Sequence, residues 1–287
     1  MIVVAGATGS VGSRIVLELL ARGEQVRALV RPTSDYGRLQ AAGAEIALGD
    51  LKDAPSLEHA CQGADVVITT ATASKRGDDR LAAVDLEGNY HLIAAAERAG
   101  VGHFILVSTV GASPESPVEL FRAKGLAEEQ LRASGMAHTI LQPAPFMDVW
   151  FGMLVELPMH AGRPVTLVGE SRRRHAFIAE RDVALLAAAA PRTPSARNVT
   201  LQIGGPEAIT WLDVVRAYEA AAGRPIAVQS VPPGAPIPGL PEPVWGLAAS
   251  LESFDTVIPM EQVTREFGIT LTSAAGFARS RLAALAP

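Results

Sequence analysis

Gly6-Ala7-Thr8-Gly9-Ser10-Val11-Gly12 joins a short apolar run, Ile2–Ala5, to a stretch with helical periodicity that begins at Val11. This order predicts a strand, a tight turn and a helix. At such a junction the first glycine permits the turn, the second lets the backbone approach a pyrophosphate, and the third lets helix and strand pack closely. The N–H groups and the dipole of the helix N-terminus favour the same anionic ligand. The residues expected to contact it are Gly6, Thr8, Gly9, Ser10, Val11 and Gly12.

The first half of the chain repeats this alternation of short β-branched runs and longer helical stretches. The expected strands are residues 2–5, 25–30, 44–48, 65–69, 103–107 and 137–141. The expected helices are residues 11–22, 35–42, 55–62, 81–99 and 119–134, and a glycine follows each of them. Such an alternation indicates a parallel sheet with crossover helices, and continuously apolar strands indicate burial on both faces. We therefore predict an α/β fold with a Rossmann-like doubly wound parallel sheet.

The second half of the chain has shorter and more interrupted elements. The expected ones are a helix over 146–157, a strand over 165–168, a helix over 182–190, a strand over 198–203 and a helix over 210–222. Residues 231–243 contain six prolines, which predicts a rigid surface loop. We expect an NAD(P)-binding Rossmann domain over residues 1–145. A small α/β substrate-binding cap region, partly interleaved with the sheet, is expected over residues 146–287.

The composition excludes several classes of protein. The 287 residues carry 25 Lys and Arg against 30 Asp and Glu, a formal charge of −5, which gives no general attraction for nucleic acid or anionic lipid. Aromatic residues make up 5% of the chain, too few for a base-stacking platform. The single cysteine, Cys61, cannot form an intrachain disulfide, and the six histidines lack a metal-ligand spacing.

These properties predict a cytoplasmic monomer or homodimer that acts on a small molecule without a metal. Met1 leads directly into an apolar run without a basic leader, and the most apolar later stretch, 136–155, is interrupted by polar residues and prolines; this favours neither a signal peptide nor a membrane span. The strongest basic run, residues 172–175, is expected to be a solvated loop rather than a nucleic-acid site. Cys61 is expected in the core.

Six motifs together resemble one family of dinucleotide-binding proteins. They are GATGSVG (6–12), RALVRP (27–32), LGDL (48–51), FILVST (104–109), FRAK (121–124) and TILQP (139–143). Over about the first 185 residues the chain resembles the NmrA-like group of atypical short-chain dehydrogenases/reductases. The resemblance implies an NAD(P)-binding Rossmann domain, in a group that holds quinone, azo-dye, triphenylmethane and isoflavonoid reductases as well as catalytically silent redox sensors.

The residue after the second expected strand favours NADP(H) over NAD(H). An NAD enzyme usually places a carboxylate there for the ribose 2′-OH, whereas an arginine can pair with a 2′-phosphate. This chain has Arg31, and Asp35 is the nearest following acid. The alternative is a solvated arginine at a strand end. By the resemblance, Asp50 and Leu51 flank the adenine, and the residues along the ribose and pyrophosphate are Thr70, Ala71 and Thr72.

Lys124 is the central candidate for catalysis. Ordinary short-chain reductases carry Tyr-x-x-x-Lys on one helix, where the phenol donates a proton and the lysine lowers its pKa. Here the residue four before Lys124 is Leu120, so the usual acid is missing. The resemblance implies that the lysine alone binds the nicotinamide ribose or polarises the substrate. A solvated helix lysine is the alternative.

Ser108 and Thr109 follow the fifth expected strand, where the superfamily carries its catalytic hydroxyl. Either can donate a hydrogen bond to a developing oxyanion, or both can simply terminate the strand. The residues expected to approach the nicotinamide after the sixth strand are Gln142, Pro143 and Phe146.

The sequence therefore predicts an NADPH-dependent reductase of an apolar carbonyl, quinone or conjugated small molecule. A non-catalytic NAD(P)-sensing regulator is the first alternative, and Leu120 in place of tyrosine favours it. An epimerase or dehydratase of the extended branch is the second, and the missing tyrosine disfavours it.

Overall fold

The computed structural model describes residues 1–73 and 81–284, and the chain forms two compact units. The first unit contains Met1–Pro143, Val183–Gln202 and Arg265–Ile269. The second unit contains Ala144–Asp182, Ile203–Thr264 and Thr270–Pro287. The chain therefore passes between the units several times instead of completing one before it starts the other.

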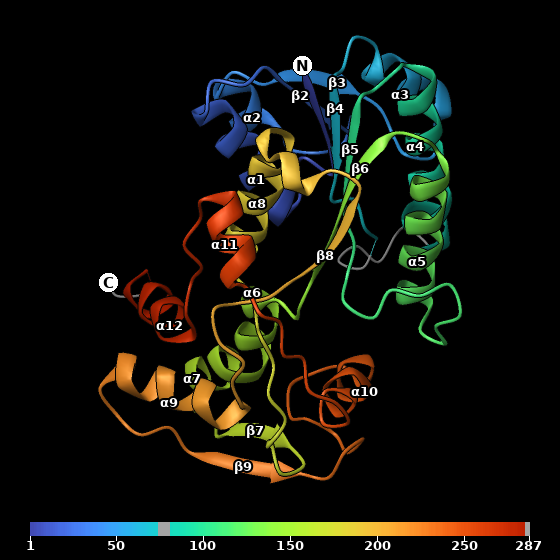
Figure 1. The fold of residues 1–287 in the computed structure, drawn as a ribbon. Coiled ribbons are helices and arrows are strands. Elements are labelled where there is room, and N and C mark those ends of the chain that lie inside the picture. Colours follow the sequence, from blue (N-terminus) through green and yellow to red (C-terminus); the bar gives the residue numbers. More distant parts are fainter. Residues whose placement is uncertain (74–80, 285–287) are drawn as a thin grey trace. The chain divides into compact units, whose positions relative to one another are not determined.

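A seven-stranded sheet forms the centre of the first unit (Figure 1), in the order β3-β2-β1-β4-β5-β6-β8. Its strands are β1 (Ile2–Ala5), β2 (Val26–Val30), β3 (Glu45–Leu48), β4 (Val66–Thr69), β5 (His103–Val107), β6 (Ala137–Pro143) and β8 (Val199–Ile203). All pairings from β3 to β6 are parallel. This is the doubly wound order of a Rossmann fold, so the predicted fold class is confirmed. The winding reverses between β1 and β4, where such folds bind ligands at the carboxyl ends of the strands.

Helices cover both faces of the sheet. Those of the first unit are α1 (Ser10–Ala21), α2 (Gly37–Ala41), α3 (Ala54–Cys61), α4 (Glu87–Arg98), α5 (Glu119–Ala133) and most of α8 (Glu180–Ala189). In Figure 1, α3, α4 and α5 lie on one side of the strands and α1 and α2 on the other. The helix predicted over 81–99 differs in one respect, because a π-helical turn, Ala82–Leu86, precedes α4.

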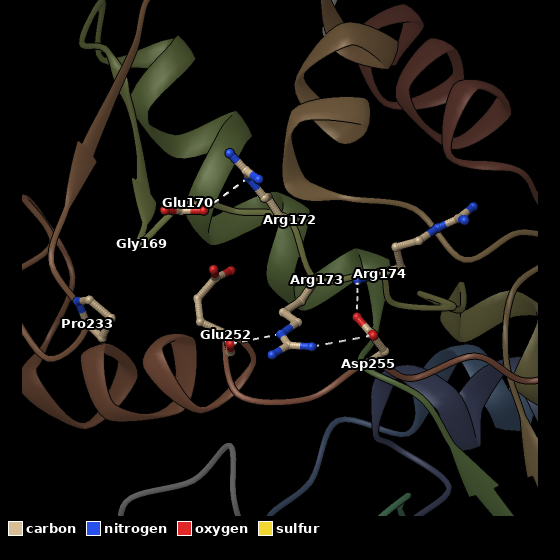
Figure 2. Close-up of a pocket in the computed structure, with 8 residues that line it drawn as sticks. All are labelled: Gly169, Glu170, Arg172, Arg173, Arg174, Pro233, Glu252 and Asp255. Carbon is tan, nitrogen blue, oxygen red and sulfur yellow. Dashed lines mark hydrogen bonds and ion pairs between the residues drawn. The ribbon is translucent and has the colours of Figure 1, made fainter.

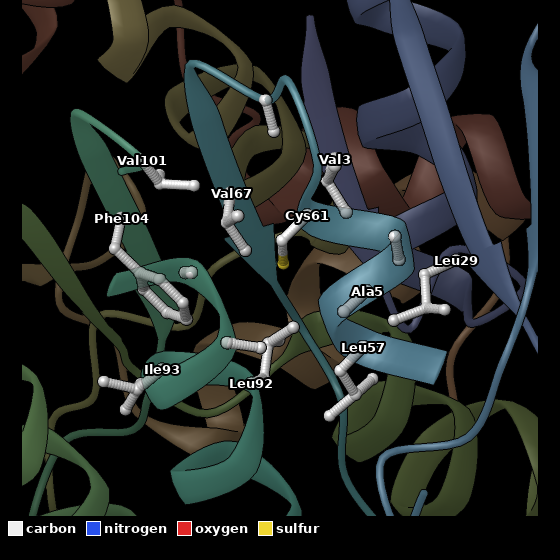
Figure 3. Close-up of a cluster of buried hydrophobic side chains, with 14 of the residues drawn as sticks. Val3, Ala5, Leu29, Leu57, Cys61, Val67, Leu92, Ile93, Val101 and Phe104 are labelled. Atoms are coloured by element: carbon white, nitrogen blue, oxygen red, sulfur yellow. The ribbon is translucent and has the colours of Figure 1, made fainter. Parts of the chain in front are cut away.

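The core on the α3–α5 side consists of aliphatic side chains and one phenylalanine (Figure 3). Val3 and Val67 on the strands, Leu57 on α3, Leu92 on α4 and Phe104 on β5 are all fully buried there. Cys61 belongs to the same cluster and is fully buried, which confirms the expectation for this residue. Burial raises the pKa of its thiol to about 11, against the opposing influence of Arg27, so the thiol is an inert part of the core.

The second unit combines short helices with a two-stranded parallel sheet. Its elements are α6 (Met147–Phe151), a π-helical turn (Gly152–Glu156), α7 (Leu157–His160), β7 (Val165–Val168), α9 (Trp211–Ala222), β9 (Val228–Val231), α10 (Glu242–Ser250), most of α11 (Glu261–Phe267) and α12 (Ala274–Ala283). The expected capping box is present, because Thr210 and Asp213 hydrogen-bond reciprocally at the start of α9. Strand β9 pairs with β7 and was not predicted, since three of its four residues are exposed and it lacks an apolar pattern.

Residues 199–203 form a strand as predicted, and this strand, β8, belongs to the main sheet and lies beside β6. One further sequence expectation needs correction. The expected proline-rich loop is shorter than 231–243, because Val231 ends β9 and Glu242 begins α10. Pro243 fits there because a proline in the first turn of a helix gives up no intrahelical hydrogen bond.

Candidate functional site

The turn between β1 and α1 has the geometry of a phosphate-binding loop. Gly6 has φ +74°, a conformation that costs glycine little, and its carbonyl accepts a hydrogen bond of 2.9 Å from Gly9 N. A Cβ on Gly12 would lie 2.2 Å from Gly6 O, so only glycine lets α1 start against the turn. Gly9 forms no side-chain cap, and the first turn of α1 contains no acidic residue. The helix N-terminus is therefore suited to an anion.

Gly9 is the least crowded of the three glycines in the turn. A Cβ built there would have Gly6 O, at 3.1 Å, as its one neighbour within 4 Å among the described residues, whereas Gly6 and Gly12 each have at least three. Of the other residues expected around the turn, Val11 is buried, Thr8 is half-buried and Ser10 is exposed. The turn therefore has hydrogen-bond donors and a backbone suited to an anion such as a pyrophosphate.

The end of β4 lies against the same turn. Thr70 Oγ1 is 3.4 Å from both Ala5 O and Gly6 O, so β4 and the β1–α1 turn are joined where the winding of the sheet reverses. Ala71 is buried and Thr72 half-buried directly after it. The structure therefore brings the Thr70–Thr72 segment and the glycine turn together, as their predicted shared ligand requires.

Arg31 lies beyond the carboxyl end of β2, and Asp50 and Leu51 lie beyond that of β3, the neighbouring edge strand. Arg31 directly follows β2 and is half-buried. Asp50 Oδ1 accepts a hydrogen bond of 2.9 Å from Lys52 N, and Ser56 Oγ bonds the Asp50 backbone. Leu51 packs against the buried cluster around Ala71. All three are at the carboxyl edge of the sheet, where Rossmann folds hold the adenosine half of a dinucleotide.

Lys124 is buried in an ion pair that the sequence did not reveal. Its side chain is 6% exposed, and Nζ lies 3.0 Å from Asp85 Oδ1, whose side chain is fully buried. Nζ also donates a hydrogen bond of 3.0 Å to Ala71 O, while Asp85 Oδ2 accepts one of 2.9 Å from Ala73 N. Lys124 is therefore not a solvated helix lysine. Its hydrogen bond to Ala71 O connects α5 to the segment after β4.

The π-helical turn at Ala82–Leu86 contains Asp85. Such turns occur often at functional sites because the extra residue re-aims side chains. The neighbouring Asn89 is buried and donates from Nδ2 to Asp85 O at 3.0 Å, while its Oδ1 accepts from Thr69 Oγ1 at 3.3 Å. Asp85 and Asn89 were missed because residues 81–99 were interpreted as one regular helix. A signal was available, since both are polar residues on the buried side of that helix.

Ser108 and Gln142 meet at a second buried carboxylate, Glu128 on α5. Ser108 Oγ donates to Glu128 Oε1 at 2.5 Å, and Gln142 Nε2 donates to the two carboxylate oxygens at 2.9 and 3.1 Å. Arg132 adds a contact of 2.8 Å to Oε2. The hydroxyl of the neighbouring Thr109 donates a hydrogen bond of 3.3 Å to Val110 O. Glu128 was not predicted, although Lys124, Glu128 and Arg132 follow one another at four-residue spacing on one helix face.

Pro143 ends β6, and Phe146 lies three residues later in the second unit. Pro143 is buried, and its carbonyl accepts a hydrogen bond of 3.1 Å from Val110 N. Phe146 precedes α6 and forms an isolated parallel bridge with Ile178. Its approach to a nicotinamide stays a prediction.

The basic run of the second unit borders a cavity of about 550 Å³ (Figure 2). Arg172 pairs with Glu170 at 3.0 Å, Arg173 lies 3.6 Å from Asp255, and Asp255 also accepts from Arg174 N at 2.8 Å. Arginines and carboxylates thus alternate around it, with Glu252 as the third acid. Such a lining offers no excess positive charge to a nucleic acid.

His175, at the end of this run, corrects the expectation of a solvated loop. It is fully buried, and Nε2 lies 2.9 Å from Leu251 O. Burial lowers the pKa of the imidazole more than the Leu251 carbonyl and Asp255 raise it, so the ring is neutral at pH 7. The basic run therefore ends in a structural histidine, and only its arginines reach the solvent side.

Within residues 1–73 and 81–284, His, Cys, Asp and Glu side chains do not gather in groups of three that can hold a metal ion. In the same part of the chain, no helix combines the length and the apolar character that crossing a membrane requires.

Comparison with known proteins adds independent information to this geometry. Residues 6–194 match a family described as NAD(P)H-binding. The chain is 35% identical over 227 residues to the NAD(P)H azoreductase of Xenophilus azovorans, covering 79% of this chain and 75% of that protein. It is 28% identical over 233 residues to the photosystem II assembly factor Ycf39 of Trieres chinensis, covering 80% and 72%. The NADPH complex of the Escherichia coli quinone oxidoreductase QOR2 superposes with a TM-score of 0.82 at 22% identity, over 98% of this chain and 99% of that one.

Proposed function

Since this chain belongs to the NAD(P)H-binding family, we propose that it is an NADPH-dependent reductase of an apolar carbonyl, quinone or other conjugated small molecule. The observation that carries the proposal is the glycine turn, where the helix N-terminus has no side-chain cap and Gly9 is less crowded than Gly6 or Gly12. The azo and quinone substrates in the names of two similar proteins support the substrate class. All of these substrates are conjugated and accept a hydride.

Under this proposal, different residues bind different parts of the cofactor. The turn from Gly6 to Gly12 holds the pyrophosphate, and Arg31 pairs with the 2′-phosphate, which is the reason to prefer NADP(H) to NAD(H). Asp50 and Leu51 flank the adenine. The segment Thr70–Thr72 borders the ribose and pyrophosphate. The nicotinamide end is assigned to Lys124, Gln142, Pro143 and Phe146.

The cofactor supplies the hydride, and the protein must position the cofactor and supply the proton. The Lys124 ammonium has three N–H bonds; one donates to Ala71 O, and Nζ also lies 3.0 Å from Asp85 Oδ1 in an ion pair. Under this proposal another of its N–H bonds donates to the nicotinamide ribose or to a substrate oxygen. Thr109 can also turn its hydroxyl outward, because its bond to Val110 O is long at 3.3 Å. We assign residues 1–145, together with Phe146, to the cofactor, and the region over 146–287, partly interleaved with the sheet, to the substrate.

A non-catalytic NAD(P)-sensing role is the second candidate. Leu120 stands where the usual acid would be, and one similar protein is named for photosystem assembly rather than for a reaction. A sensor would bind the dinucleotide through the same turn and Arg31, without needing a proton donor. Turnover of NADPH with a panel of quinones, azo dyes and carbonyl compounds separates the two roles, because a sensor binds NADPH and leaves it unoxidised.

Gly9→Val tests the phosphate turn itself. Gly9 has φ −74° and ψ 167°, which a β-branched residue tolerates, so the fold should survive while the side chain fills the space meant for the pyrophosphate. We expect calorimetry to detect no NADPH binding to this variant. The matched control is Gly102→Val before β5, where a Cβ would meet Asp65 O at 3.6 Å and affinity should stay unchanged. A folded Gly9→Val protein with wild-type affinity would refute the assignment.

A further inference from the structure

Glu128 is the most heavily hydrogen-bonded carboxylate at the carboxyl edge of the sheet. Its side chain is 3% exposed, yet it receives donors from three residues on three different elements. Ser108 follows β5, Gln142 belongs to β6 and Arg132 lies one turn further along α5. In each of these contacts the neighbouring residue donates and an oxygen of Glu128 accepts.

The short Ser108–Glu128 hydrogen bond determines whether the Ser108 hydroxyl can donate a hydrogen bond to another partner or only accept one. A serine hydroxyl has one hydrogen and two lone pairs. At 2.5 Å that hydrogen is directed at Glu128, and Glu128 donates no hydrogen to Ser108 in exchange. Towards any other partner, Ser108 Oγ can then only accept. This conflicts with the expectation that Ser108 donates to a developing oxyanion.

Glu128 fixes the orientation of Gln142 in the same way. The side-chain amide could be turned about its end, but its oxygen would then face two carboxylate oxygens at 2.9 and 3.1 Å, which is repulsive. The NH2 group must therefore point to Glu128, and the carbonyl oxygen Oε1 points away from it. Ser108 and Gln142 are close neighbours in the sheet, since Ser108 N donates to Leu141 O at 2.7 Å.

We propose that Glu128 is a positioning residue that turns Ser108 and Gln142 into hydrogen-bond acceptors for the carboxamide N–H2 of the nicotinamide. The inference rests on the proposed function, because it requires the dinucleotide to place its nicotinamide over the ends of β5 and β6. The carboxamide is the one strong hydrogen-bond donor on that ring. Thr109 and Lys124 are then the groups that we expect to donate to a substrate oxygen.

An analogue that lacks the donor tests this directly by binding. In 3-acetylpyridine adenine dinucleotide phosphate, a methyl ketone replaces the carboxamide, so the donor is lost and the carbonyl is kept. We expect wild-type protein to bind NADP⁺ about two- to tenfold more tightly than this analogue, the value of one or two neutral hydrogen bonds. In Glu128→Gln the new amide presents N–H to Ser108 or Gln142, so one of them must turn, and the preference should disappear.

Three controls separate this role from a general loss of structure. Glu129→Gln makes the same change on the exposed next residue of α5 and should keep the preference. Ser108→Ala removes one acceptor without touching Glu128, so it should reduce the preference even if Glu128→Gln folds poorly. The ligand 2′-phospho-ADP-ribose lacks the nicotinamide, and its affinity should be the same in all three variants.

The possible results distinguish this inference from the proposed function. If wild-type protein binds NADP⁺ and the analogue equally well, or if Glu128→Gln keeps the preference, the positioning role is wrong although the dinucleotide site stands. A purely structural Glu128 would weaken NADP⁺ and the analogue by the same factor in Glu128→Gln. If neither NADP⁺ nor 2′-phospho-ADP-ribose binds to wild-type protein, the proposed function fails and this inference fails with it.

Discussion

The two units place their buried charges in different surroundings. In the first unit, Lys124, Asp85 and Glu128 contact residues at the carboxyl ends of β4, β5 and β6. In the second unit, Glu156 lies among helices, where it accepts hydrogen bonds from Tyr218 on α9 at 2.5 Å and from Arg281 on α12 at 2.6 Å. The buried charges of the first unit lie at the edge where ligands bind in a doubly wound sheet. Glu156 and its partners in the second unit join a π-helical turn to two helices.

This difference separates binding chemistry from packing. A buried ion pair is weak evidence for stability, because desolvation offsets most of its attraction. The buried charges of the first unit, at the carboxyl edge of the sheet, therefore require an explanation other than stability, and ligand binding provides one. Glu156 has an explanation inside the fold, since it connects segments distant in sequence. Variants of the first set should mainly change ligand binding and turnover, and variants of the second set should mainly change stability.

Lys124→Met should have the largest effect. It keeps the aliphatic stem and removes the charge, and losing one positioned acid–base group typically lowers turnover by about 10²–10⁴-fold. The affinity for NADPH should fall much less, because the glycine turn and Arg31 remain. Steady-state kinetics with a quinone acceptor and calorimetry with NADPH measure the two quantities.

The Lys124 variant leaves Asp85 buried without its partner, which can destabilise the fold. Lys124→Met combined with Asp85→Asn removes both charges and should restore the unfolding temperature but not turnover. The exposed Lys52 provides a control, because Lys52→Met should leave turnover unchanged. Wild-type turnover in the folded double variant would show that the proton comes from Thr109 or from water.

How much the sequence could predict also differs between the units. The six strands from β1 to β6 and the glycine turn follow from local patterns of apolar residues and glycines, so they were predicted to within about two residues at most ends. The partners of Lys124 were not, because Asp85 lies 39 positions away and a π-helical turn sets its direction. The burial of His175 depends on Leu251 and Thr256, which no local pattern connects to it. Local periodicity gives the elements, whereas the site depends on side chains brought together from distant segments.

Arg281→Met tests the second unit and should reduce stability without changing NADPH affinity. Arg281 is 45% exposed but Glu156 only 5%, so removing the arginine leaves a buried carboxylate that has lost its paired cation and keeps the hydrogen bond from Tyr218. Breaking a buried pair typically costs about 3–5 kcal/mol, and we expect the lower end because the Arg281 side is open to water. Chemical denaturation measures the loss, and an unchanged Kd for NADPH is the control.

The pH dependence of this loss has a definite sign. Burial alone raises the pKa of Glu156, but hydrogen bonds from Arg281 and Tyr218 outweigh it and hold the pKa below its ordinary value. A lowered folded-state pKa contributes stability above the unfolded-state value, and this contribution disappears as the pH falls through the folded-state pKa. The difference between wild type and Arg281→Met should therefore shrink as the pH is lowered from 7 to 3. A constant difference would mean that Arg281 acts through packing alone.

Arg31→Ala should have the smallest effect of the three, and it is the most selective. A hydrogen bond to a charged group is commonly worth about 1.5–3 kcal/mol, so NADPH affinity should fall about tenfold or more. NADH has no 2′-phosphate and should lose little. Arg38 on α2 is exposed and is the matched control, because Arg38→Ala should leave both affinities unchanged. Equal losses for the two cofactors in Arg31→Ala, or a wild type that prefers NADH, would show that Arg31 does not recognise the 2′-phosphate. The strand-edge charges of the first unit would then define a dinucleotide site without selectivity for NADP(H).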